Sequence, residues 1–335
     1  MFKPVYRVTD HFLSLVERIA VISTKINESD IRLPLKARLQ REALEKNAHS
    51  STSIEGNILS LAQVSSLSEN REIDADWRQK QEVINYLEAL RWIIKRKEVL
   101  INKAHLLRLH ATITKKMLAD EKSGSFKKKP NYVVNEKGIV VYTPPAPKET
   151  PRLIEELLEW VEKRETHPII KSAIFHHQLV NIHPFPDGNG RLARLTSQWI
   201  LYQYDFDPYH IFPLDDFFAG DRKRYYEKIQ QARELDYDFT YWIEYAAEGI
   251  LETVEKLYSR IKKFVFSSVG KIDITPKQEE LINLLAREKV LNSSQLCREL
   301  KINRSRVNQL IVPLVNAHIV KKEGKARATR YYLAA

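Results

Sequence analysis

The sequence predicts a mostly α-helical protein that carries one short β-hairpin and a small separate unit at its C-terminal end. Long segments with apolar residues at helical spacing dominate the chain, such as DADWRQKQEVINYLEALRWII and TYWIEYAAEGILETVEKLYSRIKKF. Two β-rich runs in NYVVNEKGIVVYTPPAP flank a short polar turn, which is typical of a hairpin. Near residue 270, FSSVGKIDITP combines small residues with a proline, as a domain boundary often does. We therefore expect a helical bundle followed by a compact second domain.

Composition excludes several classes of protein. The 335 residues are 43% hydrophobic and 29% charged, which is ordinary for a soluble globular protein with a large core and a small second domain. The sequence has no run of 18 apolar residues and no signal peptide at its start, so we expect a cytoplasmic protein without a membrane partner. Cys297 is the one cysteine, which excludes an internal disulfide framework, and there is no Cys/His cluster for zinc.

Residues 1–100 are expected to form a helical region. Within it, LKARLQREALEKNAHSSTSIEGN has the pattern of a long helix that ends near residues 51–57. Residues 101–270 follow as the main helical core. They contain the hairpin at residues 131–147, which a proline-rich segment brings to an end.

The most informative segment is HPFPDGNGRLAR, residues 183–194. The apolar run before it, SAIFHHQLVNI, spaces Ile174, Gln178 and Ile182 four residues apart, as one face of a helix does. We expect this helix to carry His183 at its end, because the prolines that follow stop it. With an ordinary pKa of about 6.5, a histidine in this place is the natural proton acceptor.

The next residues predict a site for an anion. Gly188 and Gly190 allow positive φ angles and leave room for a ligand, and a helix that begins near Arg191 directs its positive end at the turn. Arg191 and Arg194 are three residues apart, so both side chains share one face above the turn, where guanidinium groups can bind phosphate oxygens. A lone Asp187 suits Mg²⁺, which uses one or two carboxylates and completes its shell with phosphates and water.

Together these groups indicate phosphoryl or nucleotidyl transfer. A hydroxyl would lose its proton to His183 and attack a phosphorus that the turn, the metal and the arginines hold. Catalysis of this kind depends on positioning and charge, so it needs no nucleophile from the protein. The alternative is a capped helix with an incidental glycine turn, which has no use for two arginines and an acid around that turn.

The segment resembles the signature of the Fic family, HxFx(D/E)GNGRxxR, with every specified position present. The resemblance implies a helical Fic core and the transfer of AMP from ATP to a Ser, Thr or Tyr hydroxyl of a protein, with pyrophosphate leaving. By this resemblance His183 would be the base and Asp187 the Mg²⁺ ligand. Gly188, Asn189 and Gly190 would surround the phosphates, and Arg191 and Arg194 would bind the outer phosphates.

Two residues of the signature favour AMP transfer over phosphorylation. The related Doc kinases carry lysine where Gly190 stands here and lack an arginine at the place of Arg194, and they bind the nucleotide in the reverse direction. The base of the nucleotide stays open, because some relatives use UTP or a CDP-linked group.

A second resemblance concerns Ser51, Glu55 and Gly56, which occupy the specified positions of the family's inhibitory motif, (S/T)xxxE(G/N). In relatives this glutamate pairs with the second arginine of the signature. A carboxylate bound to Arg194 would occupy the place that a γ-phosphate needs, so we interpret Glu55 as an internal lock. In some relatives the same glutamate directs a water that removes AMP from proteins, so the direction of the reaction stays open.

By the same resemblance, the hairpin is the flap that covers the active site. Its edge would pair with an extended target segment and bring a hydroxyl to His183. The residues expected to dock the target are Val133, Val134, Ile139, Val140 and Val141. A surface hairpin without this role is the alternative. The chain departs from the family at Lys127, where relatives have arginine in a G-x-(Y/F)-R stretch, and at Val180, where many have glutamate.

Residues 275–335 are the expected second domain, and they hold most of the net positive charge. They contain 12 Lys and Arg against 5 Asp and Glu, whereas the formal net charge of the whole chain is +11. Three helical patterns and two β-rich runs around Gly324 look like a winged helix-turn-helix. The residues expected to contact DNA are Arg304, Arg306, Asn308, Lys321, Lys322, Lys325 and Arg327. A domain that binds protein or packs on a neighbouring subunit is the alternative.

Two classes of function follow. In the first, the chain is a protein adenylyltransferase that Glu55 restrains, that modifies itself as well as a target protein, and whose second domain selects a location or partner. In the second, the chain is chiefly a DNA-binding regulator whose Fic site senses a nucleotide or modifies only the chain itself. Because relatives often dimerise, a homodimer is also among the expected assemblies.

Overall fold

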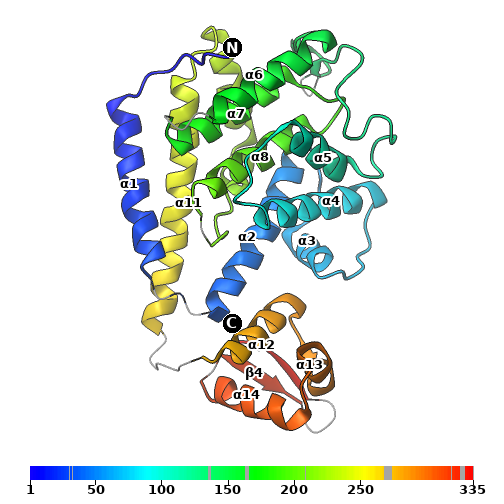
Figure 1. Ribbon diagram of the computed structural model, residues 1–335, viewed down its shortest axis with the longest axis vertical. Coiled ribbons are helices and arrows are strands. Elements are labelled where there is room, and N and C mark those ends of the chain that lie inside the picture. Colours follow the sequence, from blue (N-terminus) through cyan, green and yellow to red (C-terminus); the bar gives the residue numbers. More distant parts are fainter. Residues whose placement is uncertain are drawn as a thin grey trace.

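The computed structural model describes residues 1–29, 31, 33–134, 137–162, 166–207, 209–267, 274–317, 319–324 and 329–334. This part of the chain is mostly helical (Figure 1), which confirms the predicted fold class. Its α-helices are α1 (Asp10–Asn27), α2 (Leu33–Ile54), α3 (Leu61–Ser68), α4 (Trp77–Ile94), α5 (Lys103–Thr114), α6 (Thr150–Glu162), α7 (Pro168–Ile182), α8 (Asn189–Gln203), α9 (Asp215–Gly220), α10 (Arg222–Glu234), α11 (Thr240–Ser267), α12 (Pro276–Glu288), α13 (Ser293–Leu300) and α14 (Arg304–Asn316). Its strands are β1 (Val133–Val134), β2 (Val140–Tyr142), β3 (Leu291–Asn292), β4 (Val320–Glu323) and β5 (Arg330–Leu333). None of the described helices is long and apolar enough to cross a membrane.

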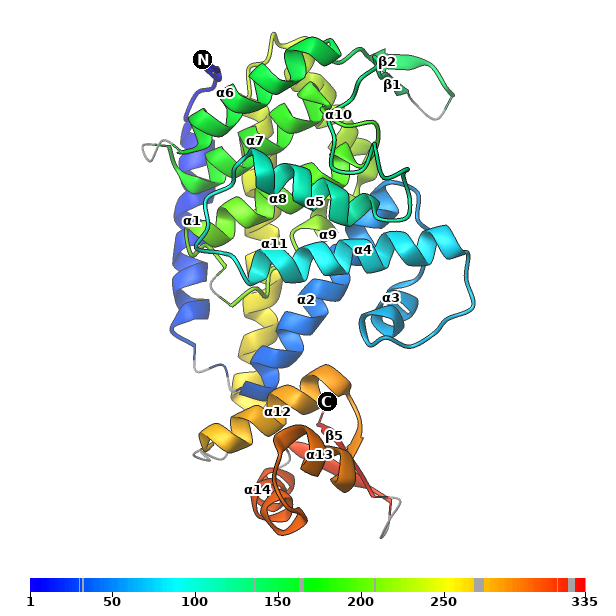
Figure 2. The ribbon, with the colours of Figure 1, turned by 45° about the vertical axis from the view of Figure 1, so that its right-hand side comes forward.

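Helices α1 and α11 run side by side along one edge of the molecule (Figures 1 and 2). Thr9 caps α1 by accepting a hydrogen bond from the Phe12 N–H (3.1 Å), and its hydroxyl donates to Glu244 on α11 (2.5 Å). Ile19 of α1 and Val254 of α11 are fully buried. The apolar faces of both helices therefore belong to the common core.

Helices α7 and α8 lie side by side at the centre of the molecule (Figure 2). Nearly every residue of both helices is buried, including Trp199 and Arg194 on α8. Helices α4 and α5 pack on α8, whereas α6 and α11 pack on α7. Residues 183–188, which join α7 to α8, are thus anchored in the core at both ends.

Strands β1 and β2 form the predicted hairpin, which projects from the helical body in Figure 2. Val133 pairs with Tyr142 and Val134 with Val140, and the register shifts between the two pairs. The exposed apolar side chains of the hairpin are those of Val134, Ile139, Val140 and Val141. Residues 135–136, at the turn, lie outside the described residues.

The C-terminal unit, from α12 to β5, has a core of its own in which Leu281, Val307 and Leu314 are fully buried. Its antiparallel sheet has the order β3-β5-β4. The sequence predicts two strands here, and the structure adds β3 as a third. Two residues are too few to show a period-two pattern, so β3 is defined only by its pairing with β5.

Helix α12 of the C-terminal unit contacts the N-terminal half of α2 (Figures 1 and 2). The Arg41 guanidinium on α2 donates to the carbonyl of Ala286, and Lys289 forms an ion pair with Glu69. One end of α2 therefore contacts the C-terminal unit, and the other end carries Ser51.

Candidate active site

His183 directly follows α7 and ends that helix in the left-handed region (φ 48°, ψ 56°). Its N–H donates to the Leu179 carbonyl (3.0 Å), and its ring Nδ1 lies 3.2 Å from the Val180 carbonyl oxygen. Because a carbonyl can only accept a hydrogen bond, Nδ1 carries the proton in this contact. Nε2 is therefore the proton acceptor of the ring.

Burial lowers the pKa of His183 to about 4. The positive charges of Lys127 and Arg233 add to this effect, whereas the hydrogen bond to a backbone carbonyl and the charge of Glu55 oppose it. The imidazole is therefore neutral at pH 7, which is the form that accepts a proton.

Two asparagines fold the loop that follows His183. The Asn189 side chain accepts from the Phe185 N–H (3.0 Å) and donates to the Phe185 carbonyl (2.9 Å). Asn131 donates to the carbonyls of Phe185 (2.9 Å) and His183 (3.2 Å), and the Lys127 ammonium donates to the Asn131 side chain (2.8 Å). The sequence predicts that Asn189 helps to bind phosphate, but its side-chain amide is already hydrogen-bonded within the loop. The group of Asn189 that could bind an anion is therefore its backbone N–H at the start of α8.

His110 on α5 contacts the same loop, although no pattern in the sequence predicts this role. Its ring stacks on Phe185 with centroids 3.8 Å apart. The Gly124 N–H donates to Nδ1 (2.9 Å), so Nε2 carries the proton and donates to the Asp187 carbonyl (3.0 Å). Burial lowers the pKa of His110 to about 4, which keeps the ring neutral. His110 therefore fixes the backbone of Asp187.

The glycine turn leads directly into α8, which begins at Asn189. Gly188 has φ +77°, a left-handed conformation that favours glycine. At Gly190 an added Cβ would lie 2.4 Å from Glu55 Oε1 and 3.2 Å from Arg194 Nη1, so a side chain would displace these groups. The first N–H groups of α8 lack partners within the helix and give the turn the positive end of the helix dipole.

Arg194 is almost fully buried (side chain 1% exposed) and is held by the end of α2. Its Nη2 donates to Glu55 Oε1 (2.7 Å) and to the Ser51 carbonyl (2.9 Å), and its Nε donates to Ser51 Oγ (2.7 Å). Gly56 follows with φ +99°, which favours glycine and ends the helical turn. The structure thus brings Glu55 to Arg194 although 139 positions separate them in the sequence.

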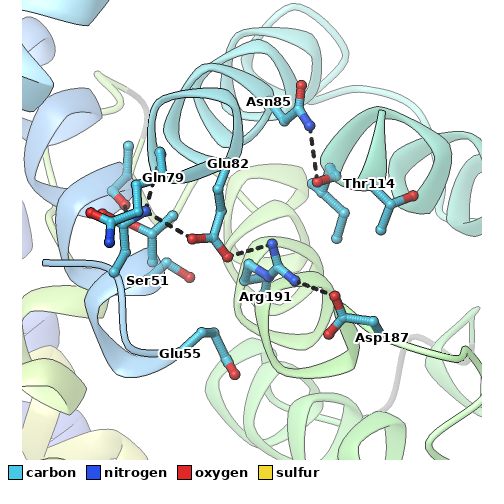
Figure 3. Close-up of polar contacts among 12 residues, drawn as sticks. Ser51, Glu55, Gln79, Glu82, Asn85, Thr114, Asp187 and Arg191 are labelled. Atoms are coloured by element: carbon cyan, nitrogen blue, oxygen red, sulfur yellow. Dashed lines mark hydrogen bonds and ion pairs between the residues drawn. The ribbon is translucent and has the colours of Figure 1, made fainter. Parts of the chain in front are cut away.

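Arg191 lies between two carboxylates, as Figure 3 shows. Its Nη2 donates to Asp187 Oδ2 (3.0 Å), and its Nη1 forms an ion pair with Glu82 Oε1 (2.6 Å). The Arg191 side chain is 5% exposed, whereas that of Asp187 is 56% exposed. Glu82 comes from α4 and belongs to no motif, so it could not be found from the sequence.

The residues around Asp187 fit a Mg²⁺ ion that is bound together with phosphates. Among the described residues, no group of three His, Cys, Asp or Glu side chains could hold a metal by itself. A single accessible carboxylate is enough for Mg²⁺ when phosphate and water oxygens complete its shell. The Nε and Nη1 of Arg191 are buried and have no hydrogen-bond acceptor in the described part of the chain, so the guanidinium keeps donors that a phosphate oxygen could accept from.

The hairpin is attached beside His183. Tyr142, at the end of β2, donates its hydroxyl to the Asn181 carbonyl (3.0 Å). Arg233 stacks on the Tyr142 ring (3.7 Å) and donates to the Asn181 side chain (2.8 Å). Because Asn181 lies two positions before His183 in the sequence, the hairpin leaves the helical body next to that residue.

The residues predicted to contact DNA lie on the C-terminal unit. Those that are described and exposed are Arg304, Arg306, Asn308, Lys321 and Lys322. The first three lie in the first turns of α14, and the two lysines lie on β4. Lys325 and Arg327 lie outside the described residues.

Comparison with known proteins decides the family of the central region. Residues 100–201 match the model of the Fic/DOC family. These residues are a Fic domain. The Fic domain contains the hairpin, His110, His183 and the glycine turn, together with both arginines of the signature.

Curated relatives match a larger part of the chain. The Protein adenylyltransferase Fic of Aedes aegypti is 30% identical over 217 residues, with 62% of this chain and 40% of the relative covered. The protein of the same name from Culex quinquefasciatus is 29% identical over 208 residues, with 59% and 39% covered. The chain thus spans well under half the length of these relatives.

Solved structures share the fold. A Fic family protein from Desulfovibrio desulfuricans G20 has a TM-score of 0.69 and 23% identity, and the match covers 100% of this chain and 99% of that one. A Fic-1 fragment from C. elegans has a TM-score of 0.60 and 22% identity, over 77% of this chain and 73% of that one. The Fic domain match begins at residue 100, so Glu55 and Glu82 lie before it.

Proposed function

We propose that this chain is a protein adenylyltransferase that transfers AMP from ATP to Ser, Thr or Tyr hydroxyls, on a target protein and on itself. One observation carries the proposal: His183 is neutral, has Nε2 as its proton acceptor, and precedes a glycine turn beside two buried arginines. The curated relatives named Protein adenylyltransferase Fic support ATP as the donor.

The proposed reaction needs a proton acceptor and a firmly held phosphate chain. His183 Nε2 takes the proton of the target hydroxyl, and the hydroxyl oxygen forms a bond to the α-phosphorus of ATP. The bond from that phosphorus to the bridging oxygen breaks, and pyrophosphate leaves. The N–H groups at the start of α8, with Arg191 and Arg194, stabilise the charge on the leaving phosphates. A Mg²⁺ ion bound at Asp187 would supply further positive charge there.

Glu55 opposes this reaction in the conformation described. Its Oε1 contacts Arg194 and lies in the space beside Gly190. A phosphate oxygen needs the same edge of the Arg194 guanidinium, and its negative charge is repelled by the carboxylate. Glu55→Gly removes the carboxylate and leaves Arg194 with its two contacts to Ser51.

The hairpin is proposed to receive the target segment. An extended peptide can pair with the backbone of a strand edge, which positions it with little selectivity for its side chains. Tyr142 holds β2 to Asn181, so a strand added to the hairpin passes close to His183. The residues proposed to line this edge are Val133, Val134, Ile139, Val140 and Val141.

Label transfer from α-³²P-ATP and from γ-³²P-ATP, each with Mg²⁺, tests the proposal. The samples are the wild-type chain, Glu55→Gly, and His183→Ala as the blank. We expect α label alone, stronger in Glu55→Gly than in the wild type and missing from the blank. Gamma label would indicate a kinase. The absence of label from every variant, even with cell lysate added, would contradict the proposal.

Removal of AMP by the same site is the second candidate. The Glu55 side chain is 31% exposed beside the glycine turn, so its carboxylate could also orient a water. The test uses chain that Glu55→Gly has labelled with AMP, incubated with unlabelled wild-type chain. Release of AMP by the wild type and not by Glu55→Gly would favour hydrolysis.

A further inference from the structure

We propose that Glu82 is a positioning residue that holds Arg191 in the orientation needed to bind the outer phosphates of the nucleotide. The inference rests on the proposed function, because it concerns the same phosphate site. Glu82 lies on α4, before the Fic domain match, and no motif contains it.

Both oxygens of the Glu82 carboxylate are engaged. Oε1 forms the ion pair with Arg191 Nη1 (2.6 Å), as Figure 3 shows. Oε2 accepts a hydrogen bond from Asn57 Nδ2 (2.8 Å). Asn57 Nδ2 also donates to the Gln79 carbonyl one turn earlier on α4 (3.1 Å). The Glu82 side chain is 13% exposed, so water competes little for it. The carboxylate is therefore fixed from two sides.

Arg191 needs such a partner because the other carboxylate that it contacts, that of Asp187, is expected to bind a metal ion. Figure 3 shows Glu82 and Asp187 on opposite sides of the Arg191 guanidinium. Asp187 lies in the loop and is more than half exposed, whereas Glu82 lies on a packed helix. If Asp187 held a Mg²⁺ ion, its carboxylate would bind Arg191 less strongly, and Glu82 would remain as the fixed carboxylate. A guanidinium that is held in advance loses less freedom when it binds phosphate.

The negative charge of Glu82 also repels phosphate, so Glu82 could instead weaken nucleotide binding. A carboxylate that mainly restrained Arg191 would weaken nucleotide binding, and its removal would strengthen it. The buried Nε and Nη1 of Arg191 both lack a hydrogen-bond acceptor in the described residues, even with Glu82 Oε1 2.6 Å from Nη1. Glu82 therefore balances the charge of Arg191 without using up its hydrogen-bond donors, which favours positioning over restraint.

The test compares the binding of ATP and AMP to the full chain. The background is Glu55→Gly with His183→Ala, which removes the lock and prevents transfer during the measurement. Calorimetric titration with ATP plus Mg²⁺ and with AMP is repeated after adding Glu82→Gln. We expect the Kd for ATP to rise about tenfold, as when the support of a ligand-binding group is removed. The Kd for AMP should not change, because AMP lacks the outer phosphates.

Glu88→Gln is the matched control, because Glu88 lies on the same helix and pairs with Lys115 at the surface (51% and 53% exposed). It should change neither Kd. In a chain that also carries Arg191→Ala, Glu82→Gln should have no further effect on ATP binding, because the two residues act through one contact. If Glu82→Gln does not fold, Glu82→Asp is measured instead, with a smaller rise in the ATP Kd expected.

Three results would overturn the inference. An ATP Kd that is unchanged or lower would show that Glu82 does not position Arg191, and an equal loss of ATP and AMP binding would show a general structural role. A background chain that binds neither nucleotide would overturn the proposed function together with the inference. That last result is recognised before Glu82 is changed, so the two failures are distinguishable.

Discussion

At the scale of single residues, the site depends on which hydrogen-bonding atoms are already used. Nδ1 of His183 is engaged by a carbonyl, which leaves Nε2 for a substrate proton. The Asn189 amide is occupied inside the loop, and the Arg194 guanidinium is bound by Ser51 and Glu55. Burial makes each of these contacts stronger than it would be at the surface, because water does not compete with them.

The low pKa of His183 predicts an unusual pH profile for transfer by Glu55→Gly. Since its pKa is about 4 in the chain with Glu55, the ring stays neutral down to roughly pH 5, and the rate should not fall near pH 6.5, where an unperturbed histidine gains its proton. Glu55→Gly removes a negative charge that raises this pKa, so its rate should fall only below about pH 4. Transfer rates are measured across this range, with circular dichroism to show that the chain is folded. An acidic limb near pH 6.5 would contradict the prediction.

Asn189 is predicted to matter for stability as well as for activity. Asn189→Ala removes both hydrogen bonds to the buried backbone of Phe185, which should lower the free energy of unfolding by about 2 kcal/mol. Urea unfolding monitored by tryptophan fluorescence measures this value. Asn308→Ala, at an exposed position of α14, is the control and should change it by less than about 0.5 kcal/mol. Equal values for the two variants would refute this account of the loop.

At the scale of elements, the motif loop is held by segments that come before it in the chain. Helix α5 supports it through His110, and the stretch before β1 supports it through Lys127 and Asn131. Lys127 stands where the family has arginine, and its side-chain ammonium donates to Asn131 Oδ1 (2.8 Å) and to the Ile182 carbonyl (3.2 Å). The departure from the family pattern therefore leaves the loop supported.

His110→Phe tests the role of α5. The substitution keeps an aromatic ring against Phe185 but removes the bonds to the Asp187 carbonyl and the Gly124 N–H. In the Glu55→Gly background we expect the transfer rate to fall about tenfold, with a higher Mg²⁺ concentration needed for half the maximal rate. His105→Phe is the control, because His105 is a half-buried histidine of the same helix whose ring contacts Trp92 and Trp199. An unchanged Mg²⁺ requirement in His110→Phe would mean that the Asp187 backbone is held without this histidine.

At the scale of the whole molecule, α2 connects the two ends of the structure. Its N-terminal half contacts α12 of the C-terminal unit, and its last turn carries Ser51 and leads to Glu55. The C-terminal unit docks on the helical body, yet Arg304, Arg306 and the lysines of β4 stay exposed. Its basic face is therefore accessible to a partner while the unit is docked.

DNA binding through the C-terminal unit remains a prediction with a direct test. Arg306→Ala should weaken binding of the full chain to duplex DNA and reduce the slope of log affinity against log salt by about one unit, because one phosphate contact is lost. Fluorescence anisotropy at several salt concentrations measures both quantities. Arg18→Ala removes an exposed arginine on α1 and should change neither. If the wild-type chain does not bind DNA at low salt, the unit serves a protein partner or an assembly contact.

Much of the fold and of the candidate site could be predicted because its signals are local. The helices follow from apolar spacing, and the hairpin from two short β-rich runs around a turn. His183, Asp187, the glycines and the two arginines lie within one short segment, where the ends of two helices and a turn fix their arrangement. Strand β3 was missed because it has two residues and exists only through its partner strand.

The sequence by itself determined the groups that we propose to hold a phosphate and accept a proton, since they are neighbours in the chain. Tertiary structure alone decided which distant side chains complete the site: Glu82 bound to Arg191, His110 bound to the Asp187 carbonyl, and Asn131 bound to the loop carbonyl of Phe185. It also decided that α12 docks on α2. The contacts of Glu82, His110 and Asn131 join residues far apart in sequence, and each is made by a single polar side chain on a helix or loop. No periodicity or spacing along the chain records such a contact, because only the packing of the helices brings its two partners together.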